Sequence, residues 1–228
     1  MNVGVITARK GSKSIANKNL VLIGGKKLIE FSYEAAINSN LDLIIISTND
    51  DKIIELFEPE LINNDRLKLD KRPDYLCTDT SPSIDTVLYL VKKYKINKDD
   101  FITLLQPTSP FRLSKHINEA LEEIERSKST SLFSIKETPH SSNPNKIMRI
   151  INGKIVGGNS FQRKQDCDIY YQRNGAIYIS NVKNLTLNKS FFSDKNGYII
   201  MNKLESIDID DGDDLTLAKA LINYKSNE

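Results

Sequence analysis

The feature that most constrains the fold is an alternation of short apolar runs with amphipathic stretches. Residues 3–7 form an apolar run typical of a buried strand, and residues 27–38 carry apolar side chains at helical spacing. A second apolar run at 41–47 precedes a short helix predicted for 51–57. Strands that alternate with helices over short connections predict an α/β fold, in which a parallel sheet lies between layers of helices.

The alternation continues through the middle of the chain and then changes. Apolar spacing predicts helices near 84–91 and 117–124, and strands at 101–105 and 131–135. The polar residues 63–71 show no periodicity and are expected to form an exposed loop. Asn152-Gly153, between β-branched residues, predicts a β-hairpin. We therefore expect a single domain over residues 1–228, with an insertion at about 138–172.

Charge and composition exclude several classes of protein. Thirty-two basic and thirty acidic residues leave a net charge of +2, too balanced for a protein that lives on nucleic acid or an anionic membrane. No apolar run approaches the roughly 18 residues of a membrane span. Cys77 and Cys167 form no CxxC pair, and the first residues lack the features of a signal peptide. The expected location is the reducing cytoplasm.

The loop after the first strand is the strongest candidate for chemistry. Residues 8–19 read ARKGSKSIANKN and place four cations around Gly11. Glycine and small residues let backbone N–H groups approach an anion, and spaced cations neutralise several phosphate charges. The spacing fits neither a Walker loop nor GxGxxG. Composition alone would favour the alternative, a solvated basic loop.

Two aspartates near the C-terminus form a candidate metal site. Asp208 and Asp210 alternate with isoleucines, and strand spacing would put both carboxylates on one face, about 7 Å apart at Cα. Mg²⁺ prefers one or two carboxylates together with phosphate oxygens and water. We therefore predict Mg²⁺ beside a triphosphate, with Mn²⁺ as the alternative ion.

Four motifs resemble those of the sugar-acid cytidylyltransferases, in particular the CMP-sialic acid synthetases. The basic loop follows that family's A-R-x-x-S-K-x-x-x-x-K-N signature, although Thr7 and Ser14 replace its usual proline and glycine. LLQPTSPFR, NGAIYI and SIDID resemble three further family motifs. The resemblance covers essentially the whole chain.

The resemblance implies roles for particular residues. Those implied for the nucleotide are Ala8, Arg9, Ser12, Lys13, Lys18, Asn19, Arg72 and Ser83. Those implied for the sugar acid are Gln106, Lys164, Tyr178, Phe191 and Phe192. Arg9, Lys13, Lys18 and Asp210 would be catalytic, and Asp208 and Asp210 would bind the metal.

Two assignments stay open at this stage. Lys164 stands where the family usually has arginine, so Arg163 is an alternative reader of the substrate carboxylate. Arg112 could contact the ligand or lock its own loop.

The fold and activity implied by the resemblance are specific. We expect a Rossmann-like nucleotidyltransferase sheet with flanking helices and a β-hairpin dimerisation insertion. The enzyme would transfer CMP from CTP to the anomeric hydroxyl of a sialic-acid-like 2-keto sugar acid, release pyrophosphate, and act as a homodimer. Legionaminate, pseudaminate and 3-deoxy-octulosonate are alternative acceptors. A non-catalytic nucleotide-binding regulatory module is the alternative from another class, and the sequence identifies no general base.

Overall fold

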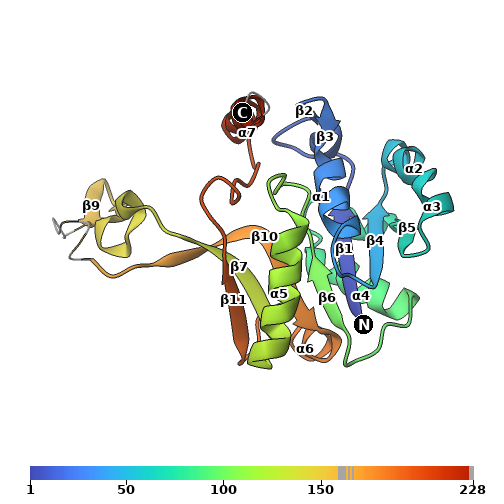
Figure 1. Cartoon of the computed structure of the whole chain (residues 1–228). Helices are drawn as coiled ribbons and strands as arrows, with labels where there is room; N and C mark the ends of the chain where they lie inside the picture. The colour runs from blue at the N-terminus through green and yellow to red at the C-terminus, as the bar shows by residue number, and fades with distance from the viewer. Residues whose placement is uncertain (159–162, 164, 166, 226–228) are drawn as a thin grey trace.

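A central sheet organises the structure, a computed structural model that describes residues 1–158, 163, 165 and 167–225. Its seven strands lie in the order β11-β7-β10-β6-β1-β4-β5 (Figure 1). β10 runs antiparallel to β6 and β7, and the other neighbouring pairs are parallel. The predicted α/β class is therefore confirmed, with a mixed rather than wholly parallel sheet. The strands are β1 (Asn2–Ala8), β4 (Leu43–Thr48), β5 (Leu67–Lys71), β6 (Phe101–Leu104), β7 (Ser131–Glu137), β10 (Tyr171–Asn181) and β11 (Asn196–Ile200).

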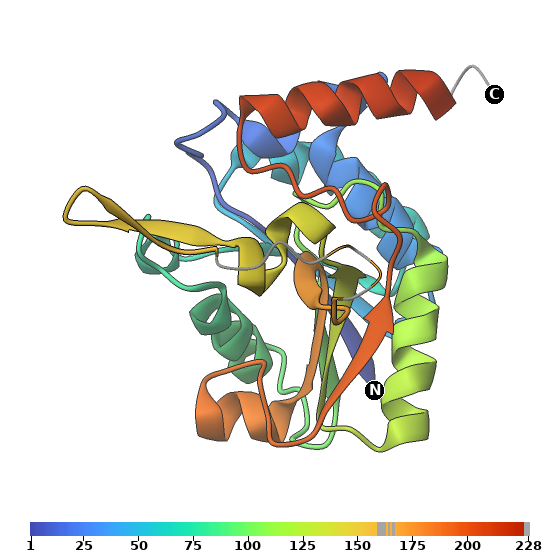
Figure 2. The same ribbon diagram turned by 90° about the vertical axis from the view of Figure 1, so that its left-hand side faces the viewer.

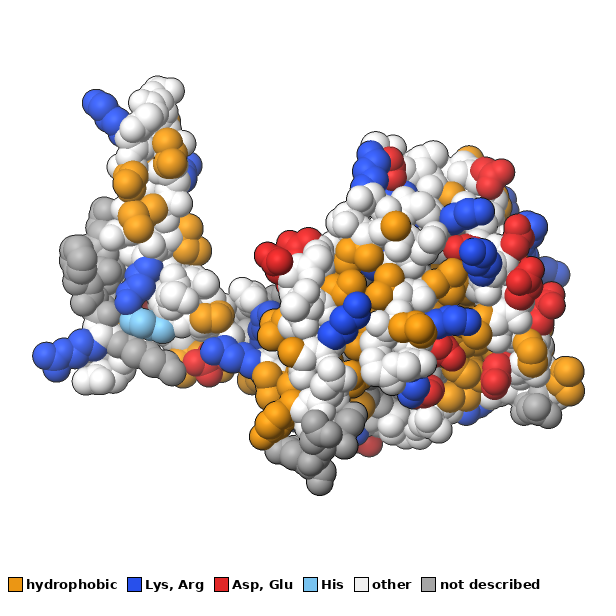
Figure 3. Space-filling model, turned by 90° about the horizontal axis from the view of Figure 1, so that it is seen from above, with side chains coloured by type: hydrophobic (Ala, Val, Ile, Leu, Met, Phe, Trp, Pro, Cys, Tyr) orange, Lys and Arg blue, Asp and Glu red, His pale blue; other side chains and the backbone are white. Residues whose placement is uncertain are grey.

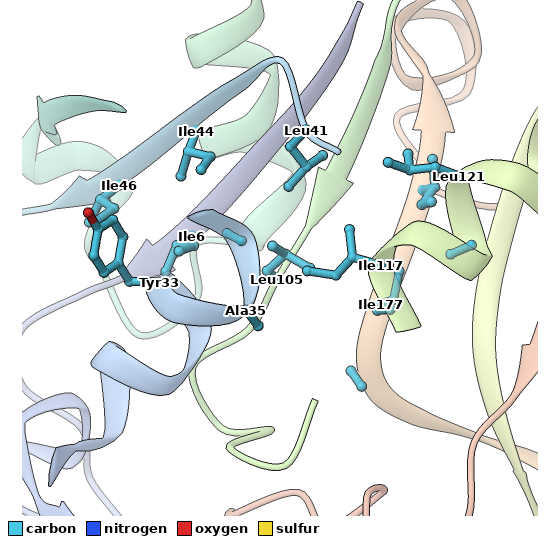
Figure 4. Packing of buried hydrophobic residues seen from close by; sticks show 14 of the residues in the cluster. Ile6, Tyr33, Ala35, Leu41, Ile44, Ile46, Leu105, Ile117, Leu121 and Ile177 are labelled. Carbon is cyan, nitrogen blue, oxygen red and sulfur yellow. The ribbon is translucent and has the colours of Figure 1, made fainter. Parts of the chain in front are cut away.

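Helices cover both faces of the sheet because its strands alternate buried side chains between two cores. In β4, Ile44 and Ile46 pack in the cluster formed with α1 (Leu28–Ile37), α2 (Asp51–Phe57) and α5 (Ser114–Ser127), as Figure 4 shows in part. Ile45 points to the opposite cluster, formed with α4 (Ser83–Lys93) and α6 (Val182–Asn188). A strand that is buried on both faces requires apolar side chains on both, and β4 has them.

The remaining elements lie around this three-layer body. A third apolar cluster joins α7 (Gly212–Lys225) to Ile23 and Ile209. Within the described residues, no helix is long and apolar enough to cross a bilayer. The short elements are β2 (Leu22–Ile23), β3 (Lys26–Lys27), α3 (Glu60–Asn63) and the 3₁₀ turns η1 (Lys18–Leu20), η2 (Asp74–Leu76), η3 (His140–Ser142) and η4 (Pro144–Lys146).

A hairpin arm projects from the body beyond the ends of β7 and β10 (Figures 1 and 2). It carries β8 (Met148–Ile151) and β9 (Lys154–Gly157), which pair antiparallel. Asn152 and Gly153 join them with φ values of 50° and 74°, as a tight hairpin turn with two positive φ angles requires. The role of this segment in dimerisation stays a prediction.

Two segments differ from expectation. Residues 63–71 do not form a loop throughout, since Leu67–Lys71 is the edge strand β5 beside β4. The sequence of β5 is polar, but its Asp70 carboxylate is buried and accepts hydrogen bonds from Ser47 (2.7 Å) and Lys93 (2.6 Å). The aspartate pair is not on a sheet strand either. Residues 207–210 form a connection held to the LLQPTSPFR loop, where the Ile209 N–H donates to the Thr108 carbonyl at 2.8 Å.

Candidate active site

The basic loop lies at the carboxyl edge of the sheet, where parallel β1, β4 and β6 all end. The loop is anchored there. The Lys10 N–H donates to Asn49 at 2.8 Å, and the Asn19 side chain donates to the Arg9 carbonyl at 3.2 Å. Ligands of α/β proteins bind at this edge because the loops of neighbouring strands converge there.

The first cavity of the site, called here the loop cavity, has a volume of about 220 Å³. It brings together most of the predicted nucleotide residues from segments far apart in sequence. Its lining residues are Thr7, Arg9, Ser12, Lys18, Asn19, Arg72, Ser81, Ser83, Thr86, Gln106, Pro107 and Thr108. Gln106, predicted to contact the sugar acid, thus lies on the side of the predicted nucleotide residues. Ala8 has a fully buried side chain in the core, so only its backbone could reach a ligand.

Asp79 pairs with two cations of the basic loop. Its two carboxylate oxygens lie 2.7 Å from Arg9 and 2.6 Å from Lys13. Hydrogen bonds from Lys13 and then Arg9 lower the pKa of Asp79. No role was predicted from the sequence for Asp79 itself, and Pro82 is the N-cap residue of α4 without a side-chain cap. The Asp79 carboxylate therefore lies where Arg9 and Lys13 were predicted to hold a phosphate.

Arg72 links the loop cavity to the end of β4. Its guanidinium donates to the Ser47 carbonyl at 2.6 Å and to the Ser47 hydroxyl at 3.2 Å. Burial lowers the pKa of Arg72. The residue is therefore held in one position while it lines the cavity.

Lys18 connects the loop cavity to residues 207–210, called here the aspartate segment. Its ammonium donates to the carbonyls of Ile209 at 2.8 Å and Asp210 at 2.9 Å. Together with the Ile209–Thr108 backbone bond, these contacts fix residues 208–210 against the cavity wall. A lysine predicted to hold phosphate thus also positions the predicted metal ligands.

The surroundings of Asp208 compensate the burial of its carboxylate only in part. Within the described residues, its Oδ1 atom is buried and accepts no hydrogen bond. Burial raises the pKa of Asp208 and the Asp210 carboxylate adds to the rise, while Thr108 and Lys18 oppose it. Gly175 leaves room for this carboxylate, because a Cβ there would lie 2.6 Å from Oδ2.

These features fit a hard divalent cation. An orphaned buried carboxylate oxygen lacks the charge or donor that normally compensates burial. In the described part of the chain, no cluster of three or more His, Cys, Asp or Glu side chains could hold a metal. Mg²⁺ suits a site of this kind because it takes one or two carboxylates and completes its shell with phosphate oxygens and water.

The second cavity, called here the aromatic cavity, has a volume of about 710 Å³. Asp208 contributes to its wall, and the aspartate segment is also hydrogen-bonded to Lys18 and Thr108 of the loop cavity. Its lining residues are Phe133, Ile135, Tyr171, Gln172, Arg173, Gly175, Tyr178, Phe192, Asn196, Gly197, Tyr198 and Asp208. The ring of Phe133 packs against those of Tyr178 and Phe192, with centroids 5.8 and 4.5 Å away.

The structure separates the residues predicted to contact the sugar acid. Tyr178 and Phe192 line the aromatic cavity, whereas Phe191 packs against the core beneath α4 and α6. Lys164 lies outside the described residues.

Arg112 locks its own loop. Its guanidinium is buried and donates to the carbonyls of Gln106 at 3.1 Å and Ala176 at 2.8 Å, and to the Ser32 hydroxyl. Burial lowers its pKa to about 9, which the Asp208 carboxylate opposes. Of the two interpretations left open by the sequence, the structure favours the one in which Arg112 locks its own loop, through hydrogen bonds.

Asn174 is a positioning residue that sequence reasoning missed. Its buried side-chain amide donates to Ser206 at 2.8 Å and accepts from Ser134 at 2.6 Å. It thereby ties β10 and β7 to the segment that leads into Asp208. The available signal was the Asn-Gly pair within a predicted strand, since an interior glycine often marks a bulge or a close approach.

Comparison with known proteins identifies the family. A family model described as cytidylyltransferase matches residues 3–221. The chain belongs to this family. It is 36% identical over 232 residues to the CMP-N,N'-diacetyllegionaminic acid synthase of Legionella pneumophila, covering 96% of this chain and 95% of that protein. It is 28% identical to the N-acylneuraminate cytidylyltransferase of Escherichia coli, covering 99% of this chain but 53% of that longer protein.

Solved structures of cytidylyltransferases share the fold. A CMP:2-keto-3-deoxy-manno-octonic acid synthetase complexed with CTP superposes with a TM-score of 0.68 at 15% identity, covering 98% of this chain and 99% of the other. A 4-diphosphocytidyl-2C-methyl-D-erythritol synthase gives a TM-score of 0.64 at 15% identity, covering 97% and 98% of the two chains. The predicted resemblance to sugar-acid cytidylyltransferases, and with it the nucleotidyltransferase class, is thus confirmed.

Proposed function

We propose that this cytidylyltransferase transfers CMP from CTP to the anomeric hydroxyl of a nine-carbon 2-keto sugar acid of the sialic or legionaminic type. Pyrophosphate is the second product. The 36% identity to a legionaminic acid synthase over nearly the full length of both proteins favours a nonulosonic acid as the acceptor. Octulosonate is the weaker alternative, since the similarity to that synthetase is one of fold at 15% identity.

One observation carries this proposal. The aspartate segment links a cavity lined by basic and hydroxyl groups to a cavity lined by aromatic rings, because Asp208 lines the second, and Lys18 and Thr108 of the first are hydrogen-bonded to the same segment. The first suits a nucleotide triphosphate, and the second suits the apolar faces of a sugar ring. A reaction that joins two substrates needs this arrangement, because both must reach the same reacting centre.

The chain's own residues would contribute charge and position. The anomeric hydroxyl loses its proton to the surrounding water as its oxygen attacks the α-phosphorus, the bond from that phosphorus to the bridging oxygen breaks, and the electron pair leaves with pyrophosphate. Arg9 and Lys13 would exchange Asp79 for the phosphates and hold the charge that grows on the leaving group. Lys18 would hold residues 208–210 at the junction of the two substrates.

Asp208 and Asp210 would hold Mg²⁺, or Mn²⁺ in its place, which when bound would supply positive charge at the reacting phosphate. Arg72 and Ser83 would face the nucleoside from the loop cavity. Tyr178 and Phe192 would pack on the sugar acid, and Gln106 would bridge the two substrates from the nucleotide side.

We further propose a homodimer that acts in the cytoplasm. The hairpin arm presents a cluster of apolar side chains to solvent, including Ile150 and Ile155 at 77% and 70% exposure (Figure 3). Clustered exposed apolar groups on a projecting arm are typical of a protein interface. A second copy of the chain is the partner that the family resemblance implies.

Pyrophosphate release tests the catalytic proposal. Each of the four nucleoside triphosphates is combined with sialic, legionaminic, pseudaminic and 3-deoxy-octulosonic acids in the presence of Mg²⁺. We expect release with CTP and a nonulosonic acid. Release with no pair would refute the enzyme proposal and favour a regulatory nucleotide-binding module, whereas release with octulosonate alone would reassign the acceptor.

A further inference from the structure

Arg173 is a cation in the aromatic cavity that has no part in the chemistry described above. Its guanidinium lies over the ring of Phe192, 4.8 Å from the centroid. Among the described residues it forms no ion pair and no side-chain hydrogen bond. It lines the same cavity as Asp208 and Tyr178. An exposed cation in the wall of a cavity, without an acidic partner among the described residues, is available to an anionic ligand.

A bulge in β10 aims this side chain into the cavity. Arg173 pairs with Ile135 of β7, and Tyr178, five residues later, pairs with Phe133, only two residues away on β7. Ile135 and Phe133 lie on one face because side chains alternate along a strand, and cross-strand partners share a face. The extra residues of β10 therefore bring Arg173 and Tyr178 onto the same face, although their numbers differ in parity. Bulges commonly re-aim a side chain beside an active site.

The stacked guanidinium is prepared to bind a carboxylate. A guanidinium that lies over an aromatic ring can keep its hydrogen-bonding edge available to a ligand. That edge matches a carboxylate through two parallel N–H···O bonds.

We propose that Arg173 binds the carboxylate of the sugar acid, an inference that rests on the proposed function. In a 2-keto sugar acid the carboxylate and the anomeric hydroxyl sit on adjacent carbons, so holding the carboxylate also places the nucleophile. Arg173 is thus a specificity-determining residue, in place of the Lys164 or Arg163 considered from the sequence.

The test compares Arg173→Met, Arg173→Gln and Arg173→Lys with wild type, on the sugar acid and on its C1 amide. Removing a charged hydrogen-bonding pair should lower kcat/KM for the acid roughly 10- to 100-fold, and leave KM for CTP unchanged. Lysine should recover part of the loss, because an ammonium keeps the charge without the planar fork. The preference for acid over amide should disappear in Arg173→Met and Arg173→Gln.

Arg126→Met is the matched control, since Arg126 lies on α5 and pairs with Glu123, outside both cavities. Unchanged preference for acid over amide in folded Arg173→Met and Arg173→Gln would overturn the proposal. A rise in KM confined to CTP would assign Arg173 to the nucleotide phosphates instead, which also overturns it. If wild type releases no pyrophosphate, the proposed function fails separately. Calorimetric binding of the sugar acid to wild type and Arg173→Met then decides the role of Arg173.

Discussion

Gly175 offers a sharp test of how the fold positions the Asp208 carboxylate. Its φ of +79° lies in the left-handed region, and a Cβ there would come within 2.6 Å of Oδ2 of Asp208. Gly175→Ala therefore combines two effects, backbone strain and displacement of the carboxylate. Gly25 separates them, because it has a φ of +82° but nothing within 4 Å of a Cβ.

The two glycine variants should lose similar stability but differ in activity. A non-glycine residue at positive φ costs about 1–2 kcal/mol. In a domain of this size that lowers Tm by roughly 2–8 °C. We expect this loss in both variants, measured by thermal unfolding. Turnover should fall roughly 10²-fold or more in Gly175→Ala alone, because a misplacement of about 1 Å at a reacting centre costs that much.

The kinetic comparison uses pyrophosphate release at saturating CTP and sugar acid. Equal turnover of Gly175→Ala and Gly25→Ala would refute the reasoning, because the close approach to Asp208 would then have no catalytic consequence. A loss confined to stability in both variants would contradict it for the same reason.

Three further perturbations test other parts of the site and the interface. Lys13→Ala should lower kcat roughly 10²-fold or more at unchanged Tm, because its side chain is 77% exposed and, in our proposal, acts on charge in the transition state; unchanged turnover would remove it from the phosphate site. Asp210→Asn should lower kcat without lowering the Tm of the ligand-free protein, whereas a change in KM for CTP alone would limit Asp210 to docking the nucleotide. Light scattering at micromolar concentration should give twice the 25.8 kDa chain mass for wild type and for the control Leu187→Asp, but the single mass for Ile150→Asp; a wild-type monomer would contradict the dimer.

The periodic parts of the fold could be predicted from sequence because periodicity reflects burial directly. The apolar run of β4 and the spacing of α5 each follow from the faces that they bury. The edge strand β5 could not be predicted in this way. Its buried Asp70 is tolerated only because Ser47 and Lys93 lie beside it in the fold, and neither is near in sequence.

The candidate site was predictable where it lies on one loop and less so where it depends on register. The basic loop does line a cavity with Arg9 and Lys18. The pair Phe191-Phe192, by contrast, was assigned one role, although only Phe192 lines the aromatic cavity, whereas Phe191 packs against Tyr178 and the core. Arg173 escaped notice because a bulge changes its face, and the pairing that creates the bulge is absent from the local sequence.

The fate of a labelled phosphate tests the central claim most directly. CTP carrying label on its α-phosphate is incubated with the enzyme, Mg²⁺ and a nonulosonic acid, and the products are separated. Transfer of CMP predicts that the label appears in a nucleotide-linked sugar acid, with one pyrophosphate released for each sugar consumed. Label recovered as free CMP with the sugar acid unchanged, or retained in CTP, would contradict the assignment of this chain as a sugar-acid cytidylyltransferase.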